Sequence, residues 1–241
     1  MEAMESAAAP LRRFGDARDA QGEVAYVPAL AGAFTGQWLD PRYWARNGAL
    51  LGGLDSPSGA WLLREGKRCL QLRRLRQPGL RIERFVWRGE AHCRPLQQLA
   101  ASQAAHAAGL AAAPVIAVGW RRSGAFYRAD VLSVCQEALP TLAQVMANGR
   151  ASLEAWAAAG RCLRRHHDLG IHLPGLSLLQ LRVGGGEGVV VADYHRARLR
   201  SAGLWQAANL AALRRSIEAQ ADTAGQPVDE VAWNCLLAAY G

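Results

Sequence analysis

The sequence predicts an α+β protein with two lobes, a small antiparallel β lobe that contains one helix and a larger helical lobe. Short strand-like runs occupy the first half of the chain, whereas long helical patterns follow Glu137. Strands that come first and helices that come later favour this class over alternating βαβ units. We therefore divide the 241 residues into a poorly ordered leader at 1–30, a β-rich lobe at 31–136 and a helical lobe at 137–241.

The expected β lobe begins after an alanine-rich leader that has scattered charges and no sustained period, as poorly ordered segments do. Four residues separate its first two strand-like runs, which is a hairpin length. Leu96, Leu99 and Ala100 are spaced for one face of a helix, and Pro95 suits its first turn. The expected elements are strands at Ala60–Leu63, Arg68–Leu72, Pro114–Val118, Ala125–Tyr127 and Val131–Val134, and a helix at Pro95–Ala108.

The expected helical lobe follows a connector near residues 134–140. One pair of strand-like runs interrupts its helical pattern, at Leu178–Val183 and Val189–Ala192. The expected helices are Leu139–Ala147, Ser152–Leu169, Leu204–Ala221 and Val228–Tyr240.

The charge of the chain favours an anionic partner. The formal net charge is +8, and Lys67 is the only lysine, so nearly all of the positive charge is arginine. Arginine suits bidentate capture of phosphate or carboxylate. An acidic membrane face, a phosphorylated glycolipid and a nucleic acid all agree with this charge. No finger, basic zipper or RNA-binding motif is present, so we do not expect nucleic acid, and a nucleic-acid-binding protein stays an alternative on charge alone.

Cysteines and apolar runs exclude several other classes. The five cysteines are scattered and form no CxxC pair, so we expect buried free thiols rather than a disulfide framework or a zinc site. No run reaches the roughly 20 apolar residues of a membrane-spanning helix, and acids stand where a signal peptide needs a basic start. These features predict a cytoplasmic protein.

A collinear series of short motifs runs from about residue 38 to residue 218. Its pieces are Asp40–Trp44, Gly59–Trp61, Leu72–Arg73, Phe85–Gly89, Arg94, Tyr127–Ala129, Gly160–Arg161, His167, Gly170, Asp193, Arg196, Trp205, Asn209–Leu210, Leu213 and Arg215–Ser216. In this series the chain resembles the 3-deoxy-D-manno-octulosonic acid (Kdo) kinase family of lipopolysaccharide core assembly. The resemblance implies a protein-kinase-like fold, and it implies ATP and Mg²⁺ as cofactors.

The resemblance implies nucleotide-binding positions at Gly59, Arg73 and Gln98. The glycine-rich turn of the family is replaced by Asp55–Gly59, where Pro57 lacks a backbone donor and Asp55 adds a negative charge. Arg73 falls at the basic strand position. Gln98, or Gln97 in a shifted register, stands for the helix carboxylate, so its pairing with Arg73 loses charge assistance.

The catalytic loop departs further from the family. Gly175 falls at the catalytic Asp position and Gln180 at the metal-binding Asn; a register shifted by one residue places Pro174 and Leu179 there instead. No carboxylate occurs from Ile171 to Gly186, so neither register supplies a base. The remaining metal position is Asp193, with Gln180 as its partner.

These absences predict a degenerate member of the family, a pseudokinase that binds ATP and Mg²⁺ weakly or not at all. We expect a binding or scaffolding role in lipopolysaccharide core biosynthesis, with Kdo-lipid A or an assembly protein as partner and peripheral contact to the cytoplasmic face of the inner membrane. The enzyme alternative is an ATP-dependent Kdo kinase with an unconventional site, in which a displaced acid such as Asp168 takes over.

Overall fold

The computed structural model describes residues 12–13, 22–30, 32–56, 58–77, 82–110, 113–135, 139–184 and 188–241. The chain forms two compact units, each with its own hydrophobic core. The first unit consists of Met1–Leu99 and Pro114–Cys135, and the second of Ala100–Ala113 and Gln136–Gly241.

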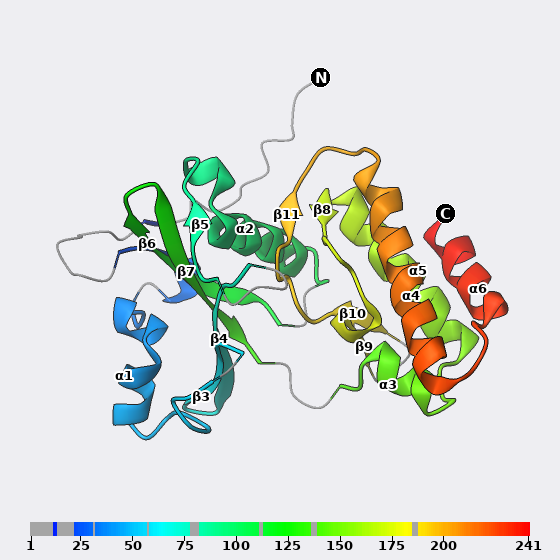
Figure 1. Cartoon of the computed structure of the whole chain (residues 1–241), viewed down its shortest axis with the longest axis horizontal. Helices are drawn as coiled ribbons and strands as arrows, with labels where there is room; N and C mark the ends of the chain where they lie inside the picture. The colour runs from blue at the N-terminus through cyan, green and yellow to red at the C-terminus, as the bar shows by residue number, and fades with distance from the viewer. Residues whose placement is uncertain are drawn as a thin grey trace. The chain divides into compact units, whose positions relative to one another are not determined.

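A seven-stranded antiparallel sheet forms the first unit, with the order β1-β2-β6-β7-β4-β3 and with β5 paired to β7 (Figure 1). Its strands are β1 (Arg12–Arg13), β2 (Glu23–Tyr26), β3 (Ala60–Glu65), β4 (Arg68–Arg74), β5 (Phe85–Val86), β6 (Val115–Ser123) and β7 (Phe126–Val134).

Two sequence predictions in this unit need correction. The segment expected to be a leader contributes β2, which pairs with β6 and buries Ala25 and Tyr26, because apolar side chains in it can cover the sheet. The two short strands expected at Ala125–Tyr127 and Val131–Val134 are one strand, β7. The polar residues between them pair with β6 and β4, so polarity on one face did not end the strand.

Each face of this sheet has its own core. Helix α2 (Arg94–Ala107) begins in the first unit, where Leu99 packs with Tyr127, Ala129 and Val131 of β7. On the other face Leu132 packs with a tryptophan cluster. Its tryptophans are Trp38 of η2 (Gly36–Leu39), Trp44 of α1 (Pro41–Arg46) and Trp61 of β3, and Leu30 of η1 (Pro28–Leu30) belongs to the same core; a further turn, η3 (Glu90–His92), precedes α2.

The second unit is mainly helical, and Figure 1 shows α6 beside α4. Its helices are α3 (Leu142–Ala147), α4 (Leu153–Asp168), α5 (Trp205–Ala224) and α6 (Glu230–Tyr240). Its strands form two antiparallel pairs, β8 (Ile171–His172) with β11 (Arg198–Leu199) and β9 (Leu181–Val183) with β10 (Val189–Val191). The run expected to be a strand at Leu178–Val183 starts as the 3₁₀ turn η4 (Leu178–Gln180).

Local sequence signals set the ends of these helices. Ser152 caps α4 by accepting a hydrogen bond from Ala155 N–H, and Thr141 forms a capping box with Gln144 at α3. Gly225 ends α5 in the left-handed region, with φ of 63°. The connector expected near residues 134–140 lies partly outside the described residues.

Within the described ranges, no helix is long and apolar enough to cross a membrane. In the same ranges, no group of three or more His, Cys, Asp or Glu side chains gathers as metal ligands would. All five cysteines are free thiols, and burial raises the pKa of both Cys93 and Cys162 to about 12.

Candidate functional site

The loop at residues 173–180 is held by the second unit's core. Leu173, Leu176 and Leu178 are almost completely buried, so the loop is fixed by apolar anchors. β8 leads into it from α4 and is paired with β11. Leu178 N–H donates to Ser216 Oγ of α5 at 3.1 Å. The loop is therefore anchored in the core and is bonded to α5.

A buried histidine network holds the start of this loop. Tyr240 O–H donates to His167 Nδ1 at 2.7 Å, and His167 Nε2 lies 3.3 Å from the side-chain amide of Asn209. That amide, oriented with its oxygen toward His167, accepts from Leu173 N–H at 3.0 Å and donates to Leu173 O at 3.1 Å. Burial, reinforced by the neighbouring His166, lowers the pKa of His167 to about 4, so His167 is neutral at pH 7. Its role is to position the loop backbone.

The neighbouring His166 is equally structural. Its Nδ1–H donates to Cys162 O at 2.8 Å, and its Nε2 accepts from Tyr194 O–H at 2.9 Å. Burial lowers the pKa of His166. The acid next to this pair, Asp168, accepts a hydrogen bond from Arg164 Nε at 2.8 Å, in a half-exposed i,i+4 ion pair on α4. Asp168 is thus paired with Arg164 on the helix surface.

Gly175 occupies a left-handed position in this loop, with φ of 71°. A Cβ atom added to Gly175 would lie 3.9 Å from Arg196 Nη1. The neighbouring charge at this position is therefore a cation. Arg196 belongs to the motif series, but the sequence does not indicate that its guanidinium lies near Gly175. This contact depends on the conformation of the turn after β10.

Gln180 and Asp193 are brought together by the β9-β10 hairpin. Gln180 directly precedes β9 and Asp193 follows β10, and Ala192 N–H donates to Gln180 O at 2.9 Å. The Gln180 side-chain oxygen accepts from Ser177 N–H at 3.0 Å, and its amide nitrogen donates to Asp193 O at 3.4 Å. The Asp193 carboxylate accepts from His195 N–H at 2.8 Å.

These side chains do not fit a kinase magnesium site. Mg²⁺ prefers oxygen ligands in octahedral geometry and is held in proteins mainly by carboxylates. Here Asp193 is the single carboxylate of the set, and its Oδ1 is already an acceptor for a backbone amide. The one oxygen that Gln180 could offer from its side chain caps the turn at Ser177. These two side chains offer few oxygen ligands, and one oxygen of each already accepts a backbone hydrogen bond. They do not match the set of ligands with which an ordinary kinase binds its metal.

The residues expected at the nucleotide are all in the first unit. Arg73 lies on the α2 face of β4 and its Nη2 donates to Gln71 Oε1 at 3.1 Å; Gln98 is buried in α2. Gly59 has φ of 67°, and an added Cβ would lie 3.1 Å from the guanidinium of Arg76.

The loop before β3 is closed by its own hydrogen bonds. Ser56 Oγ donates to Ala60 O at 2.7 Å and accepts from Ala60 N–H at 3.0 Å. Gly59 N–H donates to Ser56 O at 2.9 Å. One of the backbone donors that a phosphate cradle would use is therefore satisfied inside the loop. Pro57, which sequence reasoning held against phosphate binding, lies outside the described residues.

Residues 43–240 match the model of the lipopolysaccharide kinase (Kdo/WaaP) family. The chain belongs to this family. It is 25% identical over 204 residues to the 3-deoxy-D-manno-octulosonic acid kinase of Vibrio cholerae, covering 83% of this chain and 87% of that one. It is 27% identical over 216 residues to the enzyme of that name from Actinobacillus succinogenes, covering 85% and 90%.

A solved structure shares the fold of this Kdo/WaaP family member. The structure of WaaP in complex with acyl carrier protein matches with a TM-score of 0.55 and 18% identity, covering 83% of this chain and 84% of that chain. The kinase-like α+β fold expected from the motif series is thereby confirmed, as is the family.

Proposed function

We propose that this member of the Kdo/WaaP family is a pseudokinase that acts by binding in lipopolysaccharide core biosynthesis. The observation that carries the proposal is the loop at residues 173–180, in which Gly175 faces the cation of Arg196 and Gln180 is used as a turn cap. General acid–base assistance is worth about 10²–10⁴ in rate. A loop without a carboxylate supplies none of it.

The binding role has two partner classes. Family membership and the arginine-rich composition support an anionic glycolipid such as Kdo-lipid A, met at the cytoplasmic membrane face. A protein partner from lipopolysaccharide assembly is the other class. Since WaaP has been solved in complex with acyl carrier protein, that carrier protein is the first protein partner to test.

The test of the proposal is phosphate transfer from ATP to Kdo-lipid A by the purified full chain. We expect no transfer above the protein-free control, and calorimetry should give a dissociation constant for ATP with Mg²⁺ in the millimolar range or no binding. Asp193→Ala should complement a deletion strain as well as the wild-type gene does, because Asp193 would have no catalytic role.

Active phosphotransfer is the competing function, since the curated relatives are named as kinases. Turnover by the wild type that Asp193→Ala abolishes would establish that function and overturn the pseudokinase proposal. Loss of turnover in Asp168→Asn instead would identify the displaced acid.

A further inference from the structure

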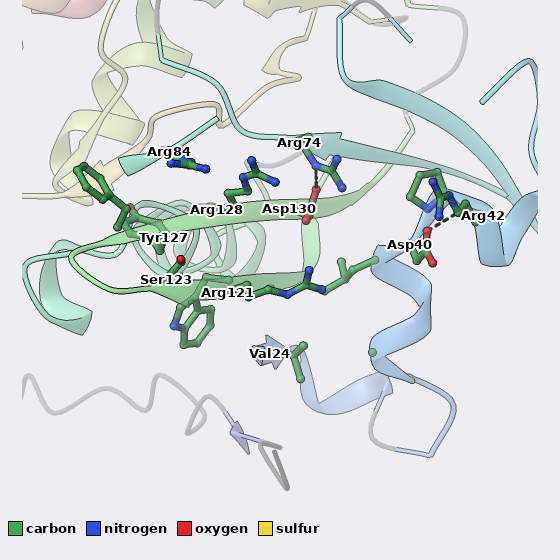
Figure 2. A pocket seen from close by; sticks show the side chains of 16 residues that line it. Val24, Asp40, Arg42, Arg74, Arg84, Arg121, Ser123, Tyr127, Arg128 and Asp130 are labelled. Carbon is green, nitrogen blue, oxygen red and sulfur yellow. Dashed lines mark hydrogen bonds and ion pairs between the residues drawn. The ribbon is translucent and has the colours of Figure 1, made fainter. Parts of the chain in front are cut away.

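A hollow of about 560 Å³ opens on the sheet of the first unit (Figure 2). Its wall is built from η2, α1, β2, β4, β6 and β7 and from the residue that precedes β5. The volume is in the range of small-molecule sites, roughly 300–1,000 Å³. The hollow is large enough for a compound of several heavy atoms.

The hollow lies on the sheet face opposite α2. Successive side chains of a strand point to opposite faces. On β7, Tyr127 and Ala129 pack in the core beside α2, so Arg128 and Asp130 point to the other face, where they line the hollow. On β4, Arg74 lines the hollow and Arg73 points away from it. The hollow is therefore separate from the candidate nucleotide residues Arg73 and Gln98.

Both carboxylates of the hollow are engaged. Arg74 Nε donates to Asp130 Oδ1 at 3.0 Å, and Asp40 caps α1 by accepting from Arg42 N–H at 2.9 Å. Burial raises the pKa of Asp130, and the charge and hydrogen bond of Arg74 offset part of that shift. Partial burial acts to lower the pKa of Arg74, but the charge and hydrogen bond of Asp130 outweigh it and raise that pKa. The charges of Arg74 and Asp130 thus neutralise each other within this ion pair.

Three further arginines form a row across the strands. Arg121 of β6 is the direct cross-strand partner of Arg128 on β7. Arg84 immediately precedes Phe85, whose partner is Tyr127, so the antiparallel register places Arg84 on the far side of Arg128. Neighbouring strands are about 4.7–4.9 Å apart. Figure 2 shows Arg84 and Arg128 beside the Arg74–Asp130 pair, with Arg121 on the next strand.

No carboxylate among the described residues forms an ion pair with this row of Arg84, Arg121 and Arg128. The charge of Arg121 acts on Asp130 only as a smaller cause that lowers its pKa. Like charges directly opposite each other on a sheet are destabilising. The three guanidinium groups lie along one side of the hollow. An anion bound there can accept charge-assisted hydrogen bonds from several of them at once.

We propose that this hollow is a phosphate-binding site for a ligand with at least two phosphate groups, held by Arg84, Arg121 and Arg128. Each phosphate offers several acceptor oxygens to the planar forks of arginine, and two phosphates match a row that spans three strands. The proposal does not depend on loss of phosphotransfer, because the hollow is on the opposite face of the sheet from Arg73. The ligand is either a free compound or the headgroup of a lipid.

The first measurement is calorimetric titration of the full chain with inorganic pyrophosphate, without magnesium and at low salt. We expect one site per chain. Arg121→Gln and Arg128→Gln should each weaken binding about tenfold or more, because each removes charge-assisted hydrogen bonds. Arg122→Gln is the matched control: it removes the same charge from the adjacent position of β6, where Arg122 stacks over Trp87 on the other face.

Three results would overturn the proposal. They are no pyrophosphate binding at millimolar concentration, binding that neither Arg121→Gln nor Arg128→Gln weakens, and binding that Arg122→Gln weakens equally, which would reflect net charge alone. A thermal unfolding curve for each variant excludes loss of folding as the cause of weak binding.

A second arm separates the two sources of the phosphates. Vesicles of phosphatidylcholine alone and of phosphatidylcholine mixed with phosphatidylinositol 4,5-bisphosphate, whose headgroup carries two phosphate monoesters, are sedimented with the full chain. Binding to the acidic vesicles that pyrophosphate displaces and Arg128→Gln weakens assigns the site to a lipid headgroup. Pyrophosphate binding without vesicle binding assigns it to a free phosphorylated compound.

Discussion

Arg196 places Nη1 3.9 Å from the point that a Cβ atom on Gly175 would occupy. Both residues have a positive φ, 71° at Gly175 and 66° at Arg196, and among the described residues Arg196 is the only non-glycine with this geometry. A left-handed non-glycine residue costs roughly 1–2 kcal/mol. The chain therefore accepts local strain in the turn that brings a cation to the position where the family resemblance expects a catalytic carboxylate.

Gly175→Asp should not create phosphate transfer to Kdo-lipid A. The new carboxylate would lie within reach of Arg196, whose charge would keep it ionised and make it a weak base. The metal-binding Asn would still be missing, and residues that act as a unit do not contribute additively. The assay is transfer of labelled phosphate from ATP by the purified variant.

Gly175→Asn is the control for this experiment, since asparagine adopts left-handed geometry without adding a charge. Thermal unfolding should show the Asp variant more stable than the Asn variant by about 0.2–1 kcal/mol, the usual range for an exposed ion pair. In an Arg196→Gln background that difference should vanish. Transfer by the Asp variant that the Asn variant lacks would contradict the expectation that one restored carboxylate is not enough for activity.

Gly160→Ala should destabilise the second unit by about 1–3 kcal/mol, the usual cost of overpacking. A Cβ atom at Gly160 would collide with the backbone oxygen of Leu236 and would lie 3.1 Å from Tyr240 N, so α4 and α6 would have to separate. Chemical denaturation measures the change. The control is Gly203→Ala, where the added Cβ would make an ordinary 3.8 Å contact with Trp205 Cδ1; equal losses in both variants would contradict the close approach of α4 and α6.

Much of the fold could be predicted because it rests on local signals. The expected helix at Ser152–Leu169 differs from α4 by one residue at each end, since Ser152 is a strong N-cap and Gly170 ends the pattern. The sequence predicts two strands in place of β7 because the polar residues Arg128 and Asp130 interrupt its apolar run. Their environment is set by β4 and β6, which are distant in sequence.

The candidate site was predicted less completely than the fold. Motif order proposed Asp193 with Gln180, or Leu179 in the shifted register, and the structure brings Gln180 and Asp193 together at the ends of β9 and β10. The side-chain bonds that engage Gln180 depend on Ser177 in its turn conformation. The arginine row depends on strand register, which no local pattern reveals. Arg128 therefore entered the sequence analysis only as part of the motif series, and Arg121 did not enter it.

Lowering the pH from about 6.5 to 4 should reduce the free energy of unfolding. Burial lowers the pKa of His167 and of His172 to about 4 from the usual 6.5, and Arg198 adds to the shift at His172. Between these pH values the unfolded chain binds protons that the folded chain excludes, so stability falls as pH falls through the window and levels off below it. With allowance for solvent screening, we expect roughly 1–2 kcal/mol from His167.

Urea unfolding at a series of pH values checks this prediction. His167→Gln should be less stable at pH 7, because it loses the hydrogen bond from Tyr240, but its stability should depend less steeply on pH below 6.5. His106→Gln, at an exposed position of α2, controls for removal of a histidine. An unchanged pH slope in His167→Gln would mean that His167 titrates alike in both states.

Arg128→Gln should stabilise the ligand-free protein by about 0.2–1 kcal/mol, the range for relief of a directly opposed like-charge pair. Arg128 is opposite Arg121 and beside Arg84, and no carboxylate in the described part of the chain pairs with any of the three. The gain should shrink as salt is added, because the repulsion is screened over about 10 Å at 0.1 M. Arg122→Gln should have the opposite sign, since it loses a cation–π contact with Trp87 at 4.8 Å. Chemical denaturation at low and high salt measures both changes in stability. A loss of stability in Arg128→Gln that does not depend on salt would show that Arg128 stabilises the sheet by packing and is not repelled by its neighbouring arginines.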